Sequence, residues 1–204
     1  KRTCTSRTNF VPVKEEIFSR LPVTIALALG AAALWTLVGI PIGIISAVRK
    51  GSVWDRGAMV FALIGVSAPV FWLAYLFLYI FWFKLGWAPP SGIPIGESVL
   101  EAVLSGRFIL PWIVLSMTFA AFYARMVRGN LIETMGEDYI RTARAKGLSE
   151  KRVIYKHGLR AALTPVVTMF GLDLAVLLGG AFITETVFGL PGVGQYAVRS
   201  IFLN

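Results

Sequence analysis

Residues 21–47 read LPVTIALALGAAALWTLVGIPIGIISA, a run of 27 residues without a charged side chain. A helix needs about 20 mostly apolar residues to cross the hydrocarbon core of a bilayer. The small residues at positions 30–33, Gly-Ala-Ala-Ala, favour close contact with a neighbouring helix over exposure to lipid. The stretch therefore predicts a transmembrane helix that packs inside a bundle.

Three further apolar stretches predict spans at about 57–83, 109–128 and 161–183, the last with one charge, Asp173. The loop 84–108 is rich in turn formers, and we expect it to be ordered with a short helix at 97–104. The predicted architecture is all-α: an external segment at 1–20 and a transmembrane domain at 21–204. Four tryptophans near span ends predict interfacial anchors: Trp54, Trp82, Trp87 and Trp112.

The composition agrees with a membrane protein. Of 204 residues, 56% are hydrophobic and 15% are charged, against about 25% charged residues in soluble domains. The net charge of +9 raises nucleic acid as a partner, but the basic residues lie between apolar runs, which is typical of membrane flanks. Residues 48–56 and 124–160 hold 12 of the 20 Lys and Arg residues, so we expect both stretches to face the cytoplasm.

Catalytic and metal chemistry find little support in the sequence. Cys4 is the only cysteine and His157 the only histidine, so neither a metal cluster nor a base-activated serine is expected. No GxxxxGK[ST] phosphate-binding loop occurs, so the chain is not expected to bind ATP itself. The prediction is a protein that is not an enzyme and holds no cofactor.

Residues 137–160, EDYIRTARAKGLSEKRVIYKHGLR, are too polar to span the membrane. Acidic residues come first and basic residues follow, an order that suits the helix dipole. Gly147 stands where a helix ends, and Ser149 can cap a second helix that runs to about Leu159. The pattern predicts two short helices joined at Gly147, with apolar positions 139, 140 and 143 on one and 153 and 154 on the other. Binding of anionic lipid by these basic helices is an alternative; insertion into DNA is disfavoured by the flanking spans.

Residues 138–148, DYIRTARAKGL, resemble the cytoplasmic "EAA" loop of ABC importer permeases, in the version found in the dipeptide and oligopeptide branch. The general pattern has Glu-Ala-Ala, three residues and Gly; here residues 141–143 read RTA, and Gly147 follows after three residues. The absent Glu and the Leu159-Arg160 pair in place of Leu-Pro favour the peptide branch. Four further stretches resemble it: RLPVT at 20–24, APVFW at 68–72, LGWAPPSG at 85–92 and ETVFGLPGVG at 185–194.

The resemblance implies the type I ABC importer permease fold in the bacterial inner membrane, with four of six spans in this chain. It implies a subunit that forms the translocation path for peptides or similar small solutes, beside a second permease subunit in a heterodimer. Two ATPase subunits holding ATP and Mg would bind a cytoplasmic coupling loop at about 129–160, and an external solute-binding protein would deliver the solute. The coupling residues it implies are Asp138, Arg141, Thr142, Ala143, Lys146, Gly147 and Leu148.

Two carboxylates are candidates for the translocation path. Asp173 lies near the middle of the last span, where a charge costs roughly 2.5–3.5 kcal/mol on insertion scales, so it should face protein or water. It either lines the path and meets a peptide amine, or hydrogen-bonds a neighbouring helix. Glu185, at the outer end of that span, either meets substrate or binding protein or is solvated. The alternative function is a membrane channel or scaffold whose basic cytoplasmic loop binds lipid.

Overall fold

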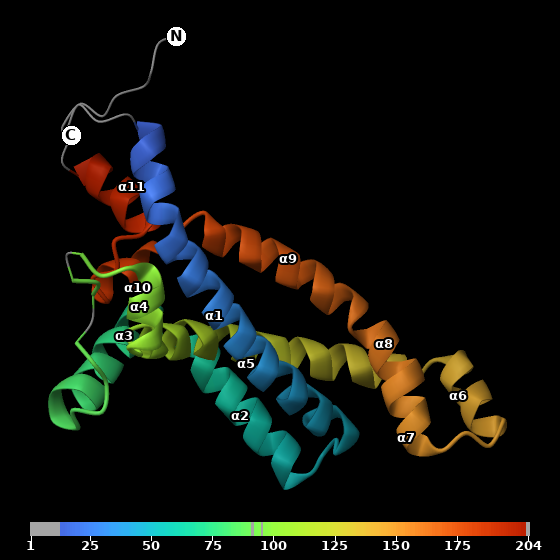
Figure 1. Ribbon diagram of the computed structural model, residues 1–204. Coiled ribbons are helices and arrows are strands. Elements are labelled where there is room, and N and C mark those ends of the chain that lie inside the picture. The colour runs from blue at the N-terminus through green and yellow to red at the C-terminus, as the bar shows by residue number, and fades with distance from the viewer. Residues whose placement is uncertain (1–12, 91, 95, 203–204) are drawn as a thin grey trace. The chain divides into compact units, whose positions relative to one another are not determined.

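The computed structural model describes residues 13–90, 92–94 and 96–202, and in these ranges every regular element is a helix (Figure 1). The predicted all-α class is confirmed. The elements are α1 (Val13–Val48), α2 (Val53–Ser67), α3 (Val70–Phe77), the π-helix η1 (Leu78–Lys84), α4 (Val99–Leu104), α5 (Ile109–Thr134), α6 (Asp138–Ala145), α7 (Glu150–Arg152), the π-helix η2 (Val153–Gly158), α8 (Leu159–Ala162), α9 (Thr164–Leu178), α10 (Phe182–Val187) and α11 (Val193–Phe202).

The chain divides into two compact units. Unit 1 comprises residues 1–33, 69–116 and 174–204, and unit 2 comprises residues 34–68 and 117–173. By length and composition, α1 and α5 are each sufficient to cross a membrane. Two bent pairs of helices also qualify if each pair is counted as one span, which gives up to four spans among the described residues.

The first and third predicted spans are single helices that are longer than expected. Helix α1 begins at Val13, so residues 13–20 belong to the same helix as the predicted span; residues 1–12 lie outside the described residues. Helix α5 continues to Thr134, beyond the predicted end at 128. Hydrophobicity marks only the part of a helix that suits lipid, and a hydrogen-bonded helix continues past it into polar residues.

The second predicted span, 57–83, is broken rather than continuous. Helix α2 ends at Ser67, α3 begins at Val70, and the two parts are bent by 99°. Pro69 lacks an N–H and disfavours helical geometry in the residue before it, and Ala68 is accordingly extended at φ −80° and ψ 124°. The predicted fourth span is bent by 44° between residues 162 and 164 and ends at Leu178, short of the expected 183.

In unit 1, small residues allow the close contact that the sequence predicts. A Cβ on Gly30 would lie 2.0 Å from the Trp112 ring, and the Trp112 indole N–H donates to the Ala26 carbonyl at 3.0 Å. Trp112 therefore packs against α1, a contact that the sequence did not predict. The expected short helix in loop 84–108 is present as α4, capped by Ser98 and Glu101 in a reciprocal capping box.

In unit 2, glycines bring the inner half of α1 and helix α2 against α5. A Cβ on Gly39 would lie 2.8 Å from the Ala120 carbonyl oxygen, and one on Gly43 would lie 2.7 Å from that of Ala124. On α2, a Cβ on Gly65 would lie 2.9 Å from the Ala121 side chain. These contacts form the core that carries the site described next.

Candidate functional site

The segment with the family-like motif, residues 138–162, contains two helical arms. We call it the hinged segment. Helix α6 ends at Ala145, Gly147 has φ +75°, and helical geometry resumes at Glu150 and continues through η2 into α8 (Figure 1). The predicted break at Gly147 is therefore present. A Cβ on Gly147 would meet nothing within 4 Å, so glycine is favoured by the left-handed backbone and not by crowding.

A small apolar core holds the two arms together. Ile140 of α6 and Val153 of η2 are completely buried, Ala143 is 7% exposed, and Met135 and Leu148 pack against them. Full burial of a Val or Ile side chain stabilises by about 1.5–3 kcal/mol relative to exposure. The predicted apolar faces are thus correct at 140, 143 and 153, while Tyr139 is exposed and takes no part.

Polar contacts reinforce this arrangement at the surface. The Arg144 guanidinium donates to the Glu150 carboxylate, with Nη2–Oε1 at 2.7 Å and Nε–Oε2 at 3.1 Å, and so joins α6 to α7. This hydrogen bond lowers the pKa of the Glu150 carboxyl. Ser149 occupies the expected N-cap position, but its side chain makes no capping bond; its carbonyl oxygen instead accepts from the Arg152 and Val153 amides.

The predicted coupling residues fall into two groups. Ala143 and Leu148 pack in the core between the two arms, where the small side chain of Ala143 permits their close contact. The other five are exposed on α6 and on the turn that follows it: Asp138, Arg141, Thr142, Lys146 and Gly147.

Asp173 has a polar partner, as its position in the last span requires. The Tyr123 hydroxyl of α5 donates to Asp173 Oδ2 of α9 at 2.7 Å. Tyr123 is buried beside Trp35, whose ring stacks on Phe119 with centroids 4.6 Å apart. Asp173 itself is half-buried, so one side of its carboxylate remains available within unit 2.

Glu185 is completely buried, which contradicts both sequence interpretations of this residue. Its carboxylate accepts from the Thr24 hydroxyl at 2.8 Å and from the Gln195 amide at 2.7 Å, while the Val193 amide donates to Thr24 Oγ1 at 2.9 Å. A Cβ on Gly192 would lie 2.3 Å from the Glu185 carboxyl carbon. Glu185 therefore ties α10, α1 and the start of α11 together within unit 1, and it is removed from the pathway candidates.

Replacement of Glu185 by glutamine tests this role. The amide can keep only one acceptor for the two donors, so we expect a loss of about 1.5–3 kcal/mol, the value of a hydrogen bond to a charged group. Thermal unfolding of the full-length protein should show a lower midpoint for Glu185→Gln, whereas Glu15→Gln, at an exposed position of α1 in the same unit, should change it less. Equal midpoints for Glu185→Gln and the wild type would contradict the role of Glu185 in holding α10, α1 and α11 together.

A buried ion pair in unit 2 was not predicted from the sequence. Arg128 of α5 donates from Nε to Asp55 Oδ1 at 2.6 Å and from Nη2 to Oδ2 at 2.9 Å, and Asp55 also accepts from the Gly51 amide and the Ser46 hydroxyl. Asp55 is 4% exposed. Arg128 looked like an ordinary flanking cation; the missed signal was Asp55, the one acid in the basic turn 48–56.

Among the described residues, no group of three or more His, Cys, Asp or Glu side chains is placed to hold a metal ion. The features that the site offers are the packed core of the two arms, the break at Gly147 and the charged side chains. A rigid, polar, two-armed segment follows a membrane-length helix, and a carboxylate lies among aromatic rings inside the same unit.

Comparison with solved structures defines the class of fold. The chain aligns with the MetNI methionine ABC transporter in an inward-facing conformation at a TM-score of 0.69 and 21% identity, covering 95% of this chain and 83% of that one. It aligns with an amino acid ABC transporter at a TM-score of 0.63 and 17% identity, covering 94% and 81%. The predicted ABC importer permease fold is confirmed.

The family follows from the sequence. The profile of the binding-protein-dependent transport system inner membrane component family matches residues 39–203, and the chain belongs to this family. The predicted inner-membrane location is thereby confirmed.

Curated relatives carry names of the peptide branch. The chain is 44% identical over 191 residues to a putative peptide transport system permease protein of Brucella abortus, covering 93% of this chain and 60% of that protein. It is 42% identical to the dipeptide transport system permease protein DppB of Alkalihalophilus pseudofirmus (96% and 64% covered) and 38% identical to DppB of Escherichia coli (94% and 63% covered). The chain thus spans about 60% of the length of these relatives.

Proposed function

We propose that this chain is part of the membrane-spanning subunit of an ATP-driven importer for peptides or similar small solutes. In this proposal the hinged segment transmits the movement of ATPase subunits to the spans, and the ATPases hold ATP and Mg. A second permease subunit completes the path, and an external solute-binding protein delivers the solute. The hinged segment supports the proposal most directly, because it connects the membrane-length helix α5 to α9 through two arms that their own core and ion pair hold together.

The contacts within the segment favour coupling over lipid binding as its function. A lipid-binding loop needs basic side chains at the surface but no fixed angle between its helices. Here Ile140 of one arm and Val153 of the other are fully buried in one shared core, and Arg144 is paired with Glu150. A docking element must keep its shape to transmit force, and these contacts fix that shape.

Gly147→Val is expected to weaken ATPase binding and to lower peptide uptake at least several-fold. A β-branched residue at φ +75° carries a backbone penalty of about 1–2 kcal/mol, so α6 and α7 should leave their native angle. The matched control is Gly129→Val, on α5, where a Cβ also meets nothing within 4 Å but φ is not positive. The measurements are uptake of a labelled peptide by cells with the full transporter and the amount of ATPase that co-purifies. Normal uptake and ATPase retention in Gly147→Val would contradict the coupling role.

We propose further that Asp173 lines the translocation path and meets the amino group of a passing peptide. Its half-buried carboxylate keeps a free side although Tyr123 donates to one oxygen. Loss of a charged hydrogen bond of about 1.5 kcal/mol corresponds to roughly tenfold, so Asp173→Asn should lower uptake of a peptide with a free amino terminus about tenfold. Uptake of the N-acetylated peptide should change little.

Tyr123→Phe separates this role from a purely structural one. It removes the hydroxyl and leaves the Asp173 charge in place, so any change in uptake that it causes should be the same for the free and the N-acetylated peptide. If Asp173→Asn lowers uptake of both peptides equally, Asp173 serves packing between α5 and α9 and not recognition.

A further inference from the structure

Unpaired positive charge gathers at one end of unit 2, in the turn 48–56 and in residues 150–160. The two carboxylates in these stretches are already engaged, Asp55 by Arg128 and Glu150 by Arg144. Seven basic side chains there make no ion pair among the described residues: Arg49, Lys50, Arg56, Lys151, Arg152, Lys156 and Arg160. The charge at this end therefore lacks a partner within the described protein, and an anionic partner would suit it.

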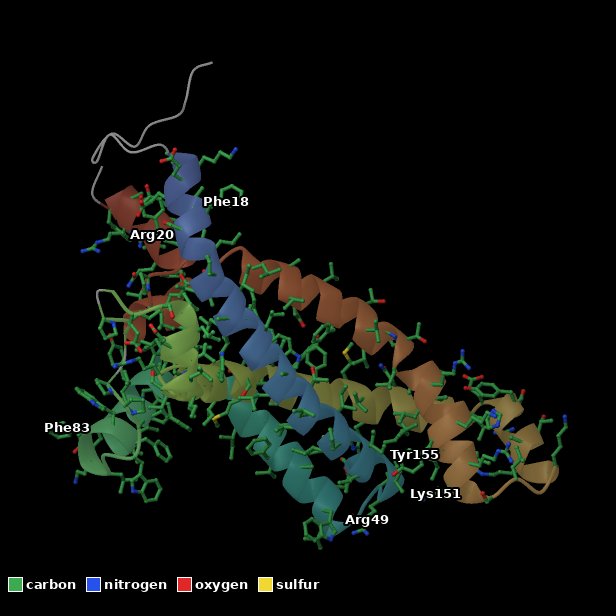
Figure 2. The ribbon with its side chains drawn as sticks, viewed as in Figure 1. Phe18, Arg20, Arg49, Phe83, Lys151 and Tyr155 are labelled. Atoms are coloured by element: carbon green, nitrogen blue, oxygen red, sulfur yellow. The ribbon has the colours of Figure 1, made fainter. Side chains whose placement is uncertain are left out.

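A groove opens beside this charge. Arg49, Trp54 and Tyr155 line a cavity of about 380 Å³ together with Ile44, Ile45 and Val48. Ile45 and Trp54 also line an adjoining cavity of about 560 Å³, whose other walls include Ile42 and Phe61. We call the two cavities together the α1–α2 groove. Figure 2 shows Arg49 and Tyr155 at the same end of unit 2, with Lys151 beside them.

The groove is polar at its mouth and apolar along its length. Arg49 and Tyr155 line the first cavity together with Trp54, whose ring is 68% exposed, and we call this end of the groove its mouth. Trp and Tyr prefer the headgroup level of a bilayer because their rings have an apolar body and a polar edge. The second cavity continues along α1 and α2, the helices of the first two predicted spans, with no charged side chain in its lining.

We propose that the α1–α2 groove binds an anionic membrane phospholipid, with its phosphate at Arg49 and Tyr155 and an acyl chain along Ile45 and Phe61. A free phosphate ion would match the mouth but would gain nothing from the apolar second cavity. A zwitterionic lipid would match the apolar part but would gain less from the unpaired cations. The site shares Tyr155 with the hinged segment and otherwise lies on α1, α2 and the turn between them, and it does not rest on the proposed transport function.

The test uses the full-length protein purified in its complex and placed in nanodiscs of phosphatidylcholine with a titrated fraction of phosphatidylglycerol. Bound phosphatidylglycerol is counted by native mass spectrometry. A cation near an anionic membrane surface contributes about fivefold in binding, so Arg49→Gln should weaken phosphatidylglycerol binding about fivefold. The matched control is Arg56→Gln, in the same turn but outside the groove lining, which should change binding less than twofold.

A photo-reactive benzoylphenylalanine in place of Trp54 gives a second readout that needs no change of charge. A crosslink to phosphatidylglycerol is expected, and it should be lost in the Arg49→Gln background. Equal weakening by Arg49→Gln and Arg56→Gln would show diffuse surface charge and overturn the site. A crosslink to another protein segment, or no preference for phosphatidylglycerol over phosphatidylcholine, would overturn it as well. Peptide uptake is not among these measurements, so a failed transport proposal leaves the result interpretable.

Discussion

Ala143→Glu is expected to abolish peptide uptake, with a loss of at least about 100-fold, while the spans still fold. Ala143 is 7% exposed and packs in the core with Ile140 and Val153, which are completely buried. A carboxylate in that core finds no hydrogen-bond partner, and burial of a polar group without one costs roughly 3 kcal/mol or more, a factor of about 100 or more. We expect the two arms to separate, so that the segment no longer presents a fixed surface to the ATPase.

The reason for the loss differs from the one that the sequence alone suggested. The motif resemblance implies that Ala143 contributes to ATPase coupling, whereas in the structure Ala143 packs with Ile140 and with Val153 of η2. Hydrogen exchange separates the two explanations. If the core opens, amides of residues 138–145 in Ala143→Glu should exchange faster even without ATPase. Ala145→Glu, the same change at an exposed position of α6, should leave that exchange unchanged.

Three results would weigh against this account in different ways. Normal uptake and normal ATPase retention in Ala143→Glu would contradict the coupling role itself. Loss of uptake with unchanged hydrogen exchange would return Ala143 to the docking surface. If neutralisation of Arg141, Arg144 and Lys146 impaired the protein more than Ala143→Glu, lipid binding would become the better explanation of the segment.

The fold class could be predicted from the sequence because a bilayer imposes one strong requirement. The apolar runs around 21–47 and 109–128 had to be helices, and α1 and α5 are. The hinge could be predicted too, because Gly147 follows a polar amphipathic stretch and no other residue takes φ +75° as easily. Each of these predictions depends on local chemistry alone.

What could not be predicted depends on residues far apart in the chain. Glu185 looked like a surface carboxylate until Thr24, 161 residues away, was found to donate to it. The packing of Trp112 could not be predicted because its partners, Gly30 and the Ala26 carbonyl, lie on another helix. The second span was predicted as one continuous helix, because transmembrane helices tolerate proline, and the break at Pro69 was therefore missed.

The Asp55–Arg128 pair is the second place where one substitution should have a large effect. Arg128→Leu leaves the Asp55 carboxylate 4% exposed with only the Ser46 hydroxyl and the Gly51 amide as donors. Loss of one partner of a buried ion pair costs about 3–5 kcal/mol, and the lower end applies here because the Arg128 side chain is 25% exposed. Thermal unfolding of the full-length protein in lipid nanodiscs should therefore show a clearly lower midpoint.

The double variant Asp55→Asn/Arg128→Leu decides whether the cost comes from the unpaired charge. Asparagine carries no charge and keeps one acceptor oxygen, which can accept from the Gly51 amide while the Ser46 hydroxyl turns to accept from the asparagine NH2 group. The double variant should therefore regain more than half of the stability that Arg128→Leu loses. Arg125→Leu, an exposed arginine one turn earlier on α5, is the matched control and should change the midpoint little. If the double variant is as unstable as Arg128→Leu alone, then the packing of the Arg128 side chain, and not its charge, holds the turn at residues 49–52 against α5. Because α5 leads directly into the hinged segment, the same variants should also change uptake in the order of their stability; an uptake defect in the stable Arg125→Leu protein would contradict that link.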